Sequence, residues 1–364
     1  MKRSINFGAG PAKLPDEVLE RIQKEFLCHP EASVSIIEMS HRSKEYKNIY
    51  NETVKLLREE MSIPNEYEVL FMHGGATGQF AAIPMNLKGN HESADYAVTG
   101  RWSLASFKEA SKYIHAKEVF DVPASFTEIL PYDKWKCNSD AAYLYYCANE
   151  TVDGVEFKNT PETFANVPLV ADVSSNILSR PFCFTNHAVV YGSTQKNLGA
   201  AGTAVVIVRK DLIKPVENIP AILSYHEMQR TASNYNTPNV FGIYVTKLVL
   251  EWIRNQGGLD VIERRNKEKA AIIYNVIDSS SGFYHSPVKP EFRSNMNIPF
   301  RIGGSSGNQQ LEEKFLDGAI ARGMIGLKGH RSVGGIRVSL YNAMTISETD
   351  ALRKYMAEFQ EKQR

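Results

Sequence analysis

The sequence lacks the features that mark secreted or membrane-spanning chains. Its 364 residues include four cysteines, too few for a disulfide framework at this length, and no two of them form a C-x-x-C pair. No apolar run is long enough to span a bilayer, and the first residues lead into a Gly/Pro turn where a secretory signal would have an apolar segment. We therefore expect a cytoplasmic protein with no membrane contact.

An excess of charge of one sign is also missing. The chain has 42 Lys and Arg against 41 Asp and Glu, a formal net charge of +1, and no basic run stands out that could follow a phosphodiester backbone. It also lacks the G-x-G-x-x-G and P-loop spacings that hold dinucleotides and nucleoside triphosphates. We expect neither a nucleic-acid partner nor a metal site.

What is present is an ordinary globular composition, 43% hydrophobic and 23% charged, at a length that suits two domains. Short apolar runs alternate with amphipathic segments, which is the pattern of an α/β protein with a largely parallel sheet. The predicted strands are 68–72, 94–99, 142–147, 169–173, 189–192 and 204–209. The predicted helices among them are 17–28, 43–61, 77–86 and 103–113.

The pattern changes after residue 240. A long helix is predicted over 240–256, ending at two glycines, and a second amphipathic stretch over 259–277 is expected to bridge two domains. The rest of the chain predicts a small α+β domain, with strands at 294–301 and 335–340 and helices at 309–322 and 349–359.

Two residues suggest a specific chemistry. Lys196 lies in a short polar loop between two apolar strands, where partial desolvation would lower the pKa of its amine. Asp172 lies at the end of another apolar strand. A solvated loop lysine and an N-cap aspartate are the commoner interpretations of each residue alone. Together they match pyridoxal phosphate, which needs an amine for its aldehyde and a carboxylate to keep its ring nitrogen protonated.

Other strand ends add to this pair. The Gly74-Gly75 turn opens a helix whose first N–H groups could bind a phosphate, although it could also be a plain strand-to-helix turn. Trp102 could lie against a planar ring, although a core position is commoner for tryptophan. Thr151 offers a hydroxyl or is a solvated turn residue. Because an anion site, an aromatic plate, a hydroxyl and a carboxylate follow four strands, and the lysine a fifth, we predict one shared site.

With these residues assembled, the chain resembles the phosphoserine aminotransferases, a fold type I group of pyridoxal-phosphate enzymes, from Phe7 almost to the C-terminus. The segments that carry the likeness include Phe7-Gly8-Ala9-Gly10-Pro11-Ala12, Met39-Ser40-His41-Arg42, Asn149-Glu150-Thr151-Val152-Asp153-Gly154, Gln195-Lys196-Asn197, Asn236-Thr237-Pro238 and Gly329-His330-Arg331-Ser332-Val333-Gly334-Gly335-Ile336-Arg337. The resemblance implies a large domain over 16–260, a small domain made of 1–15 and 261–364, and a homodimer.

The resemblance also implies a role for each site residue. Lys196 would form the Schiff base, Asp172 would meet the pyridine nitrogen, Trp102 would stack on the ring, and Thr151 would contact the ring hydroxyl. The residues implied for the cofactor phosphate are Ala76, Thr77 and Gln195, with Asn236 and Thr237 from the second subunit. Arg337 would bind the substrate carboxylate, as a planar guanidinium does well. The residues implied for the substrate phosphate are His41, Arg42, His330 and Arg331.

The activity implied is transfer of the amino group of glutamate to 3-phosphohydroxypyruvate, giving phosphoserine and 2-oxoglutarate in serine biosynthesis. Use of 4-phosphohydroxythreonine, a substrate of some relatives, stays open. Thr77 stands where many relatives have an arginine, which leaves open an aminotransferase of the same fold that acts on an unphosphorylated keto acid. A cysteine desulfurase needs a reactive cysteine in the C-terminal part, whereas the last cysteine is Cys183. A nucleotide-binding module or a catalytically silent scaffold is disfavoured by the missing nucleotide motifs and by the Asp172 and Lys196 pair.

Overall fold

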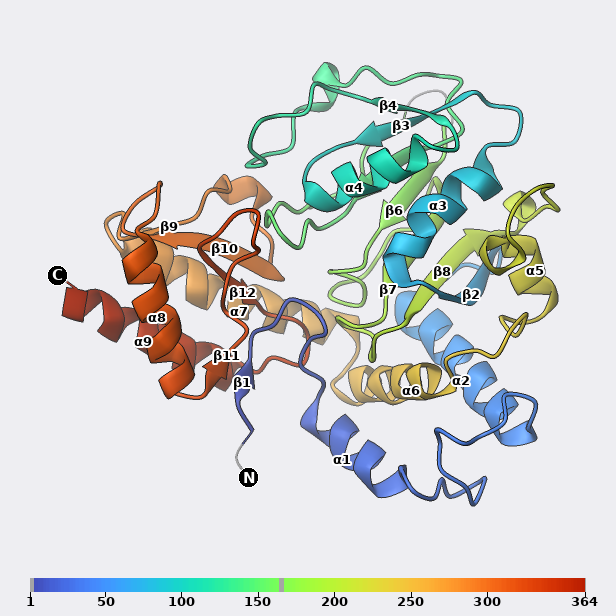
Figure 1. Ribbon diagram of the computed structural model, residues 1–364, viewed down its shortest axis with the longest axis horizontal. Coiled ribbons are helices and arrows are strands. Elements are labelled where there is room, and N and C mark those ends of the chain that lie inside the picture. The colour runs from blue at the N-terminus through green and yellow to red at the C-terminus, as the bar shows by residue number, and fades with distance from the viewer. Residues whose placement is uncertain (1–2, 164–166, 364) are drawn as a thin grey trace.

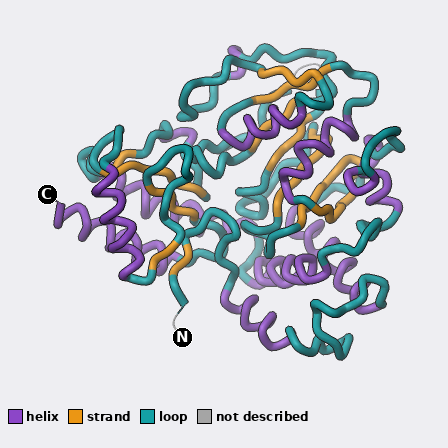
Figure 2. Tube along the Cα trace, viewed as in Figure 1, coloured by secondary structure: helices purple, strands orange, loops and turns teal. Residues whose placement is uncertain are grey.

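The computed structural model describes residues 3–163 and 167–363, which form a larger part built on one sheet and a smaller C-terminal part (Figures 1 and 2). The sheet of the larger part has the order β2-β8-β7-β6-β5-β3-β4. Its strands are β2 (Tyr67–His73), β3 (Ser93–Ala97), β4 (His115–Glu118), β5 (Leu144–Cys147), β6 (Leu169–Asp172), β7 (His187–Ser193) and β8 (Thr203–Arg209).

The direction of the strands places six carboxyl ends, those of every strand except β8, at one edge of the sheet. The strands from β4 across to β7 pair in parallel, whereas β8 is antiparallel to both of its neighbours, β2 and β7. Two reversals across β8 leave β2 running in the same direction as β7. The predicted α/β fold with a mostly parallel sheet is therefore confirmed, and loops that follow β2, β3, β5, β6 and β7 meet at this edge.

Helices cover both faces of the sheet because successive side chains of a strand point to opposite faces. In β2, Val69 and Phe71 belong to one hydrophobic core and Leu70 and Met72 to another. The first core is closed by α1 (Asp16–Glu25), α2 (Lys44–Met61) and α6 (Val240–Asn255). The second is closed by α3 (Gly75–Leu87), α4 (Arg101–Ala110) and α5 (Tyr225–Arg230).

The smaller part is an antiparallel sheet packed against helices. Its sheet has the order β12-β10-β9, with β9 (Tyr284–His285), β10 (Asn297–Ile302) and β12 (Ile336–Ser339). The helices are α7 (Leu259–Ser279), α8 (Gln309–Ala321) and α9 (Ile346–Gln363). Near the N-terminus, β1 (Ile5–Asn6) pairs in parallel with β11 (Met324–Ile325). We propose the division into 16–260 and 1–15 with 261–364 because the third core contains Phe7 together with side chains from 270 to 359.

The elements that sequence patterns did not predict are short. They are β1, β4, β9, β11, α5 and the 3-10 turns Tyr132–Lys134, Lys210–Leu212, Ala221–Leu223 and Pro290–Phe292. The edge strand β4 illustrates the reason, because three of its four side chains are exposed and it has no apolar alternation. The long helices and the buried strands were predicted, because a strong period needs several turns or residues to show.

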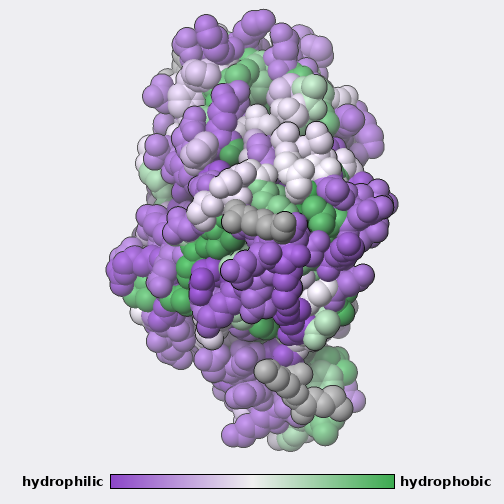
Figure 3. Space-filling view, turned by 90° about the vertical axis from the view of Figure 1, so that its left-hand side faces the viewer, coloured by the Kyte–Doolittle hydropathy of each residue, from purple (hydrophilic) through white to green (hydrophobic). Residues whose placement is uncertain are grey.

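The face of the molecule that carries the smaller part is mostly polar (Figure 3). Figure 3 shows a mostly hydrophilic face with small, separated hydrophobic patches. Within residues 3–163 and 167–363, no helix is both long and apolar enough to cross a membrane.

Candidate active site

A cavity of about 260 Å³ lies at the edge of the sheet where the carboxyl ends of β2, β3, β5, β6 and β7 meet. The residues predicted from the sequence that line it are Ala76, Thr77, Trp102, Thr151, Asp172, Gln195, Lys196, His330 and Arg337. The first seven come from the larger part of the chain and the last two from the smaller part. The cavity therefore opens between the two parts.

Lys196 presents its amine inside this cavity. The side chain follows β7 and is 9% exposed, and its Nζ donates a hydrogen bond of 2.6 Å to Thr151 Oγ1. The same Nζ lies 5.9 Å from the centre of the Trp102 ring. Burial lowers the pKa of Lys196, although the negative charge of Asp172 acts in the opposite direction. A lysine with a lowered pKa holds a larger fraction of neutral amine, which is the nucleophilic form.

Asp172 is the last residue of β6 and is buried. Its Oδ2 accepts a hydrogen bond of 3.0 Å from the Tyr191 hydroxyl, and its Oδ1 accepts one of 2.8 Å from the backbone N–H of Ser174. Burial raises the pKa of Tyr191 well above its usual value, so this hydroxyl stays protonated and donates. These two donors fix the orientation of the carboxylate, which is placed to accept a hydrogen bond from a ring nitrogen.

An anion-binding end is formed by the N-terminus of α3. Gly74 and Gly75 have positive φ angles of 87° and 58°, so the chain turns sharply out of β2 into the helix. The first N–H groups of a helix have no intrahelical partner, and here the N–H of Ala76 donates to Ser193 Oγ at 2.7 Å. Ser193 therefore orients the first turn of α3, and the helix dipole favours a phosphate at this end of the cavity.

Arg337 enters the cavity from β12. Its Nη1 reaches the backbone oxygen of Thr151 at 3.4 Å, whereas its Nε is buried and has no hydrogen-bond partner among the described residues. Burial lowers the pKa of Arg337, although the group keeps its charge at neutral pH. A buried donor without a partner is costly, so the side chain is suited to an anionic ligand. Nearby, burial and the charges of Arg337, Arg101 and Arg331 lower the pKa of His330.

The other predicted residues lie outside the cavity of the single chain. They are His41, Arg42, Asn236, Thr237 and Arg331, and all except the partly buried His41 are exposed. His41 and Arg42 precede α2, and Asn236 and Thr237 precede α6. Their roles stay predictions.

Glu150 is a site residue that the sequence reasoning missed. Its side chain is fully buried directly behind the cavity wall. Oε2 accepts from the N–H of Trp102 at 2.9 Å, and Oε1 accepts from both the N–H (2.9 Å) and the hydroxyl (2.6 Å) of Ser103. Burial and the charge of Asp153 raise the pKa of Glu150 to about 7, against these hydrogen bonds. Glu150 thus caps α4 and ties Trp102 to the turn that carries Thr151.

Gly100 makes room for this cap. A Cβ at Gly100 would lie 2.2 Å from the Cδ of Glu150, so only glycine fits between the carboxylate and the start of α4. A signal was available in the sequence, because a charged residue directly after an apolar strand needs a partner if it is buried. The donors that satisfy it come from a helix nearly fifty residues earlier, which local patterns cannot identify.

We expect Glu150→Gln to lower the free energy of unfolding by about 1–3 kcal/mol. A glutamine keeps one acceptor oxygen, so its amide NH2 must face a backbone N–H of Trp102 or Ser103. Urea unfolding of the cofactor-free protein, followed by circular dichroism, measures the change. Glu109→Gln, a partly exposed carboxylate of the same helix, is the matched control and should shift the midpoint little. Equal midpoints for the two variants would contradict the capping role.

This set of groups defines a class of enzyme. A buried lysine, a buried carboxylate oriented by two hydrogen bonds, an aromatic side chain and a helix N-terminus meet at the carboxyl ends of one doubly wound sheet. That is the arrangement of the fold type I transferases, which depend on pyridoxal phosphate.

Comparisons with known proteins narrow the class to a family. Residues 4–352 match the model of the class-V aminotransferases. The chain is 57% identical over 359 residues to a probable phosphoserine aminotransferase of Caenorhabditis elegans, covering 98% of this chain and 97% of the relative. Phosphoserine aminotransferase from Bacillus circulans subsp. alkalophilus has a TM-score of 0.96 and 42% identity, with both chains fully covered. The pyridoxal-phosphate-bound enzyme of Trichomonas vaginalis has a TM-score of 0.94 and 39% identity, covering 98% and 100%. The chain belongs to the class-V aminotransferase family.

Proposed function

We propose that the chain is a phosphoserine aminotransferase, which converts L-glutamate and 3-phosphohydroxypyruvate into 2-oxoglutarate and O-phospho-L-serine, a step of serine biosynthesis. The observation that carries the proposal is one cavity that joins Lys196 and Asp172 to Arg337, whose Nε is buried without a partner. The names of the similar proteins from Caenorhabditis elegans and Bacillus circulans support the substrate.

The residues of the cavity fit pyridoxal phosphate part by part. Lys196 would hold the aldehyde carbon, Asp172 the ring nitrogen, and Thr151 the ring hydroxyl, while Trp102 would lie along the ring face. Ala76 and Thr77 at the start of α3 and the side chain of Gln195 would hold the phosphate, joined by Asn236 and Thr237 of a second chain. When bound, the cofactor supplies an electron sink for the bonds at the α-carbon of the amino acid.

The chain's own groups perform the remaining tasks. Once free, the Lys196 amine would take the proton from the α-carbon of the amino-acid donor. In the second half-reaction, which runs in reverse, it would return a proton to the α-carbon of the new amino acid. Thr151 orients that amine through its hydroxyl. Two hydrogen bonds hold the Asp172 carboxylate in place, where it would face the ring nitrogen of the bound cofactor.

We propose that Arg337 binds the α-carboxylate that both substrates share. The guanidinium can donate two parallel hydrogen bonds to a carboxylate, and its unpartnered Nε is available for one of them. His330 lies beside it in the cavity. We propose that His330, Arg331, His41 and Arg42 hold the substrate phosphate, with more of the binding on Arg42 and Arg331 because Thr77 supplies no charge where many relatives have an arginine.

We propose a homodimer with shared active sites. Two segments of the chain carry both exposed apolar side chains and site residues that lie outside the cavity of one chain. The segment before α2 contains Leu27 (82% exposed) and Ile37 (59%) as well as His41 and Arg42. The segment before α6 contains Tyr235, 46% exposed, next to Asn236 and Thr237. A second chain would bury these apolar groups and complete the site. We propose a cytoplasmic location, which suits four free thiols.

The substrate is tested by comparing keto acids. With glutamate as donor, we expect kcat/KM for 3-phosphohydroxypyruvate to exceed that for pyruvate or glyoxylate by at least about a hundredfold, because basic groups placed for a phosphate are left unpaired by the smaller acids. Formation of 2-oxoglutarate in steady state gives both values. Equal values would favour the alternative that Thr77 raises, an aminotransferase for an unphosphorylated keto acid.

A further inference from the structure

Two buried carboxylates lie at opposite ends of the hairpin that follows β5, residues 149–156. Asn149 and Glu156 form an antiparallel bridge, and the N–H of Glu150 donates to the oxygen of Val155 at 2.8 Å. Glu150 faces α4 and the cofactor side of the cavity, as described above. Glu156 is 1% exposed and faces the smaller part of the chain. Glu150 therefore faces the larger part and Glu156 the smaller part, while the third buried carboxylate of the hairpin, Asp153, accepts from the N–H of Arg101.

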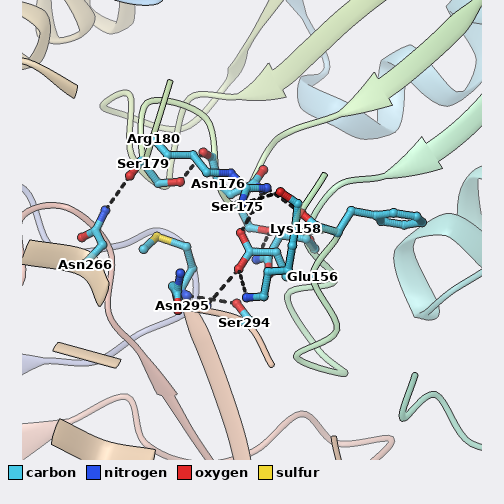
Figure 4. A network of polar contacts seen from close by, with 12 residues as sticks. Glu156, Lys158, Ser175, Asn176, Ser179, Arg180, Asn266, Ser294 and Asn295 are labelled. Carbon is cyan, nitrogen blue, oxygen red and sulfur yellow. Dashed lines mark hydrogen bonds and ion pairs between the residues drawn. The ribbon is translucent and has the colours of Figure 1, made fainter. Parts of the chain in front are cut away.

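Glu156 joins three segments through its carboxylate. Its Oε2 accepts from the N–H of Asn295 at 3.0 Å and from Lys158 Nζ at 3.2 Å. Its Oε1 accepts from the Asn176 side chain at 3.3 Å and lies 3.8 Å from Arg180 Nη2. Figure 4 shows the carboxylate of Glu156 between Asn176 on one side and Asn295 on the other. Asn176 belongs to the turn after β6, and Asn295 leads into β10, so the carboxylate joins the two parts.

The segment that Glu156 contacts leads into the strand that pairs with the strand of Arg337. Asn295 lies just before β10, and in the pairing of β10 with β12 Pro299 stands opposite Arg337. The hairpin touches that pair directly, because a Cβ at Gly154 would lie 2.3 Å from Pro299 Cδ. Arg337 in turn reaches the backbone oxygen of Thr151 in the same hairpin. The guanidinium is thus placed relative to the hairpin by its strand as well as by its own contact.

A neutral link runs beside the charged one. Asn149 Nδ2 donates to Ser175 Oγ at 2.8 Å and to Asn297 Oδ1 at 2.9 Å, and Asn297 Nδ2 donates to Ser339 Oγ at 3.1 Å. Ser339 is two residues beyond Arg337 in β12. The segment before β10 is also held to the hairpin by backbone bonds, from Ser294 N–H to the oxygen of Gly154 and from Glu156 N–H to the oxygen of Phe292, so Glu156 supplies the charged contact among several neutral ones.

We propose that Glu156 is a positioning residue for the substrate carboxylate: it fixes β10 and β12 on the hairpin so that Arg337 points into the cavity. The proposal deepens the proposed function and depends on the carboxylate-binding role of Arg337 in it. Glu156 itself does not line the cavity. A glutamine keeps an acceptor for the N–H of Asn295 but loses the negative charge that Lys158 Nζ and Arg180 Nη2 face, and so leaves two cations beside an uncharged amide.

The test is the half-reaction of the cofactor-loaded protein with glutamate alone, followed by absorbance in a single turnover. For Glu156→Gln we expect the apparent dissociation constant for glutamate to rise about tenfold and the limiting rate to change less than about threefold. The dissociation constant of pyridoxal phosphate, measured by adding it to the cofactor-free protein, should change less than about twofold, since the contacts of Lys196 and Asp172 remain.

Glu150→Gln is the matched control in the same hairpin. We expect it to raise the dissociation constant of pyridoxal phosphate about tenfold and to leave the apparent dissociation constant for glutamate nearly unchanged. Lys158→Met, which leaves the bonds to Asn295 and Asn176, should behave as the parent protein. If Glu156→Gln does not fold, Asn176→Ala replaces it in the test. We then expect a smaller rise of the apparent dissociation constant for glutamate. An unchanged glutamate constant in Glu156→Gln, or equal rises for glutamate and cofactor, would overturn the proposal. Failure of the parent protein with phosphohydroxypyruvate would overturn only the proposed substrate, since glutamate alone is used here.

Discussion

Lys196→Ala is expected to abolish the visible absorption of the protein loaded with pyridoxal phosphate and to reduce turnover about ten-thousandfold or more. Lys196 is the lysine that lines the cavity, and its amine is both the attachment point and the proton carrier in the proposed reaction. Absorption spectra of the purified variant and steady-state formation of 2-oxoglutarate measure the two effects. A variant that kept its absorption would place the aldehyde on another amine.

Lys269 provides a matched control for the loss of a buried lysine. It is 1% exposed, and burial lowers the pKa of Lys269 to about 7. Its Nζ donates to the backbone oxygens of Leu340 (3.1 Å) and Tyr341 (2.8 Å), away from the cavity. Lys269→Met should therefore keep the visible absorption while losing stability. Both lysines are buried and have a lowered pKa, so a loss of absorption in the Lys196 variant alone would come from its place in the cavity and not from the general cost of removing a buried cation.

Much of the fold and the centre of the site could be predicted from the sequence. Lys196 and Asp172 each follow a buried strand, and the carboxyl ends of parallel strands meet, so chemistry and topology converge on the same edge of the sheet. The antiparallel insertion of β8 was not predictable in this way, because an apolar strand has the same pattern in either direction. The insertion does not disturb the site, since β2 returns to the direction of β7.

The groups that sequence patterns could not identify are those whose partners are distant in the chain. Glu150 lies in Asn149-Glu150-Thr151, which has the appearance of an exposed polar turn, and its burial depends on the N–H groups of α4. Glu156 depends on Asn295 of the smaller part. Arg337 was assigned through the family resemblance, because its place over the cavity requires two parts of the chain to dock. Tertiary contacts of this kind leave no periodic signal.

Arg337→Ala is expected to lower kcat/KM for both glutamate and 3-phosphohydroxypyruvate by about a thousandfold, equivalent to about 4 kcal/mol for a buried, charged and bidentate contact. Arg337→Lys should recover part of the loss, because an ammonium keeps the charge and loses the two parallel hydrogen bonds. The dissociation constant of pyridoxal phosphate should stay close to that of the parent protein, since the cofactor contacts come from the strands of the larger part. Steady-state kinetics with each substrate varied in turn measures the losses.

Arg331→Ala distinguishes binding of the carboxylate from binding of the phosphate. Arg331 is exposed, lies outside the cavity of the single chain and is proposed for the substrate phosphate, so its loss should weaken binding of the phosphorylated keto acid more than binding of glutamate, whose second anionic group is a carboxylate. Arg337→Ala should weaken both, because the α-carboxylate is the group that the two substrates share. If Arg337→Ala impaired the phosphorylated substrate alone, the guanidinium would belong to the phosphate site. The carboxylate would then need another partner, and Glu156 would have no guanidinium to position for it.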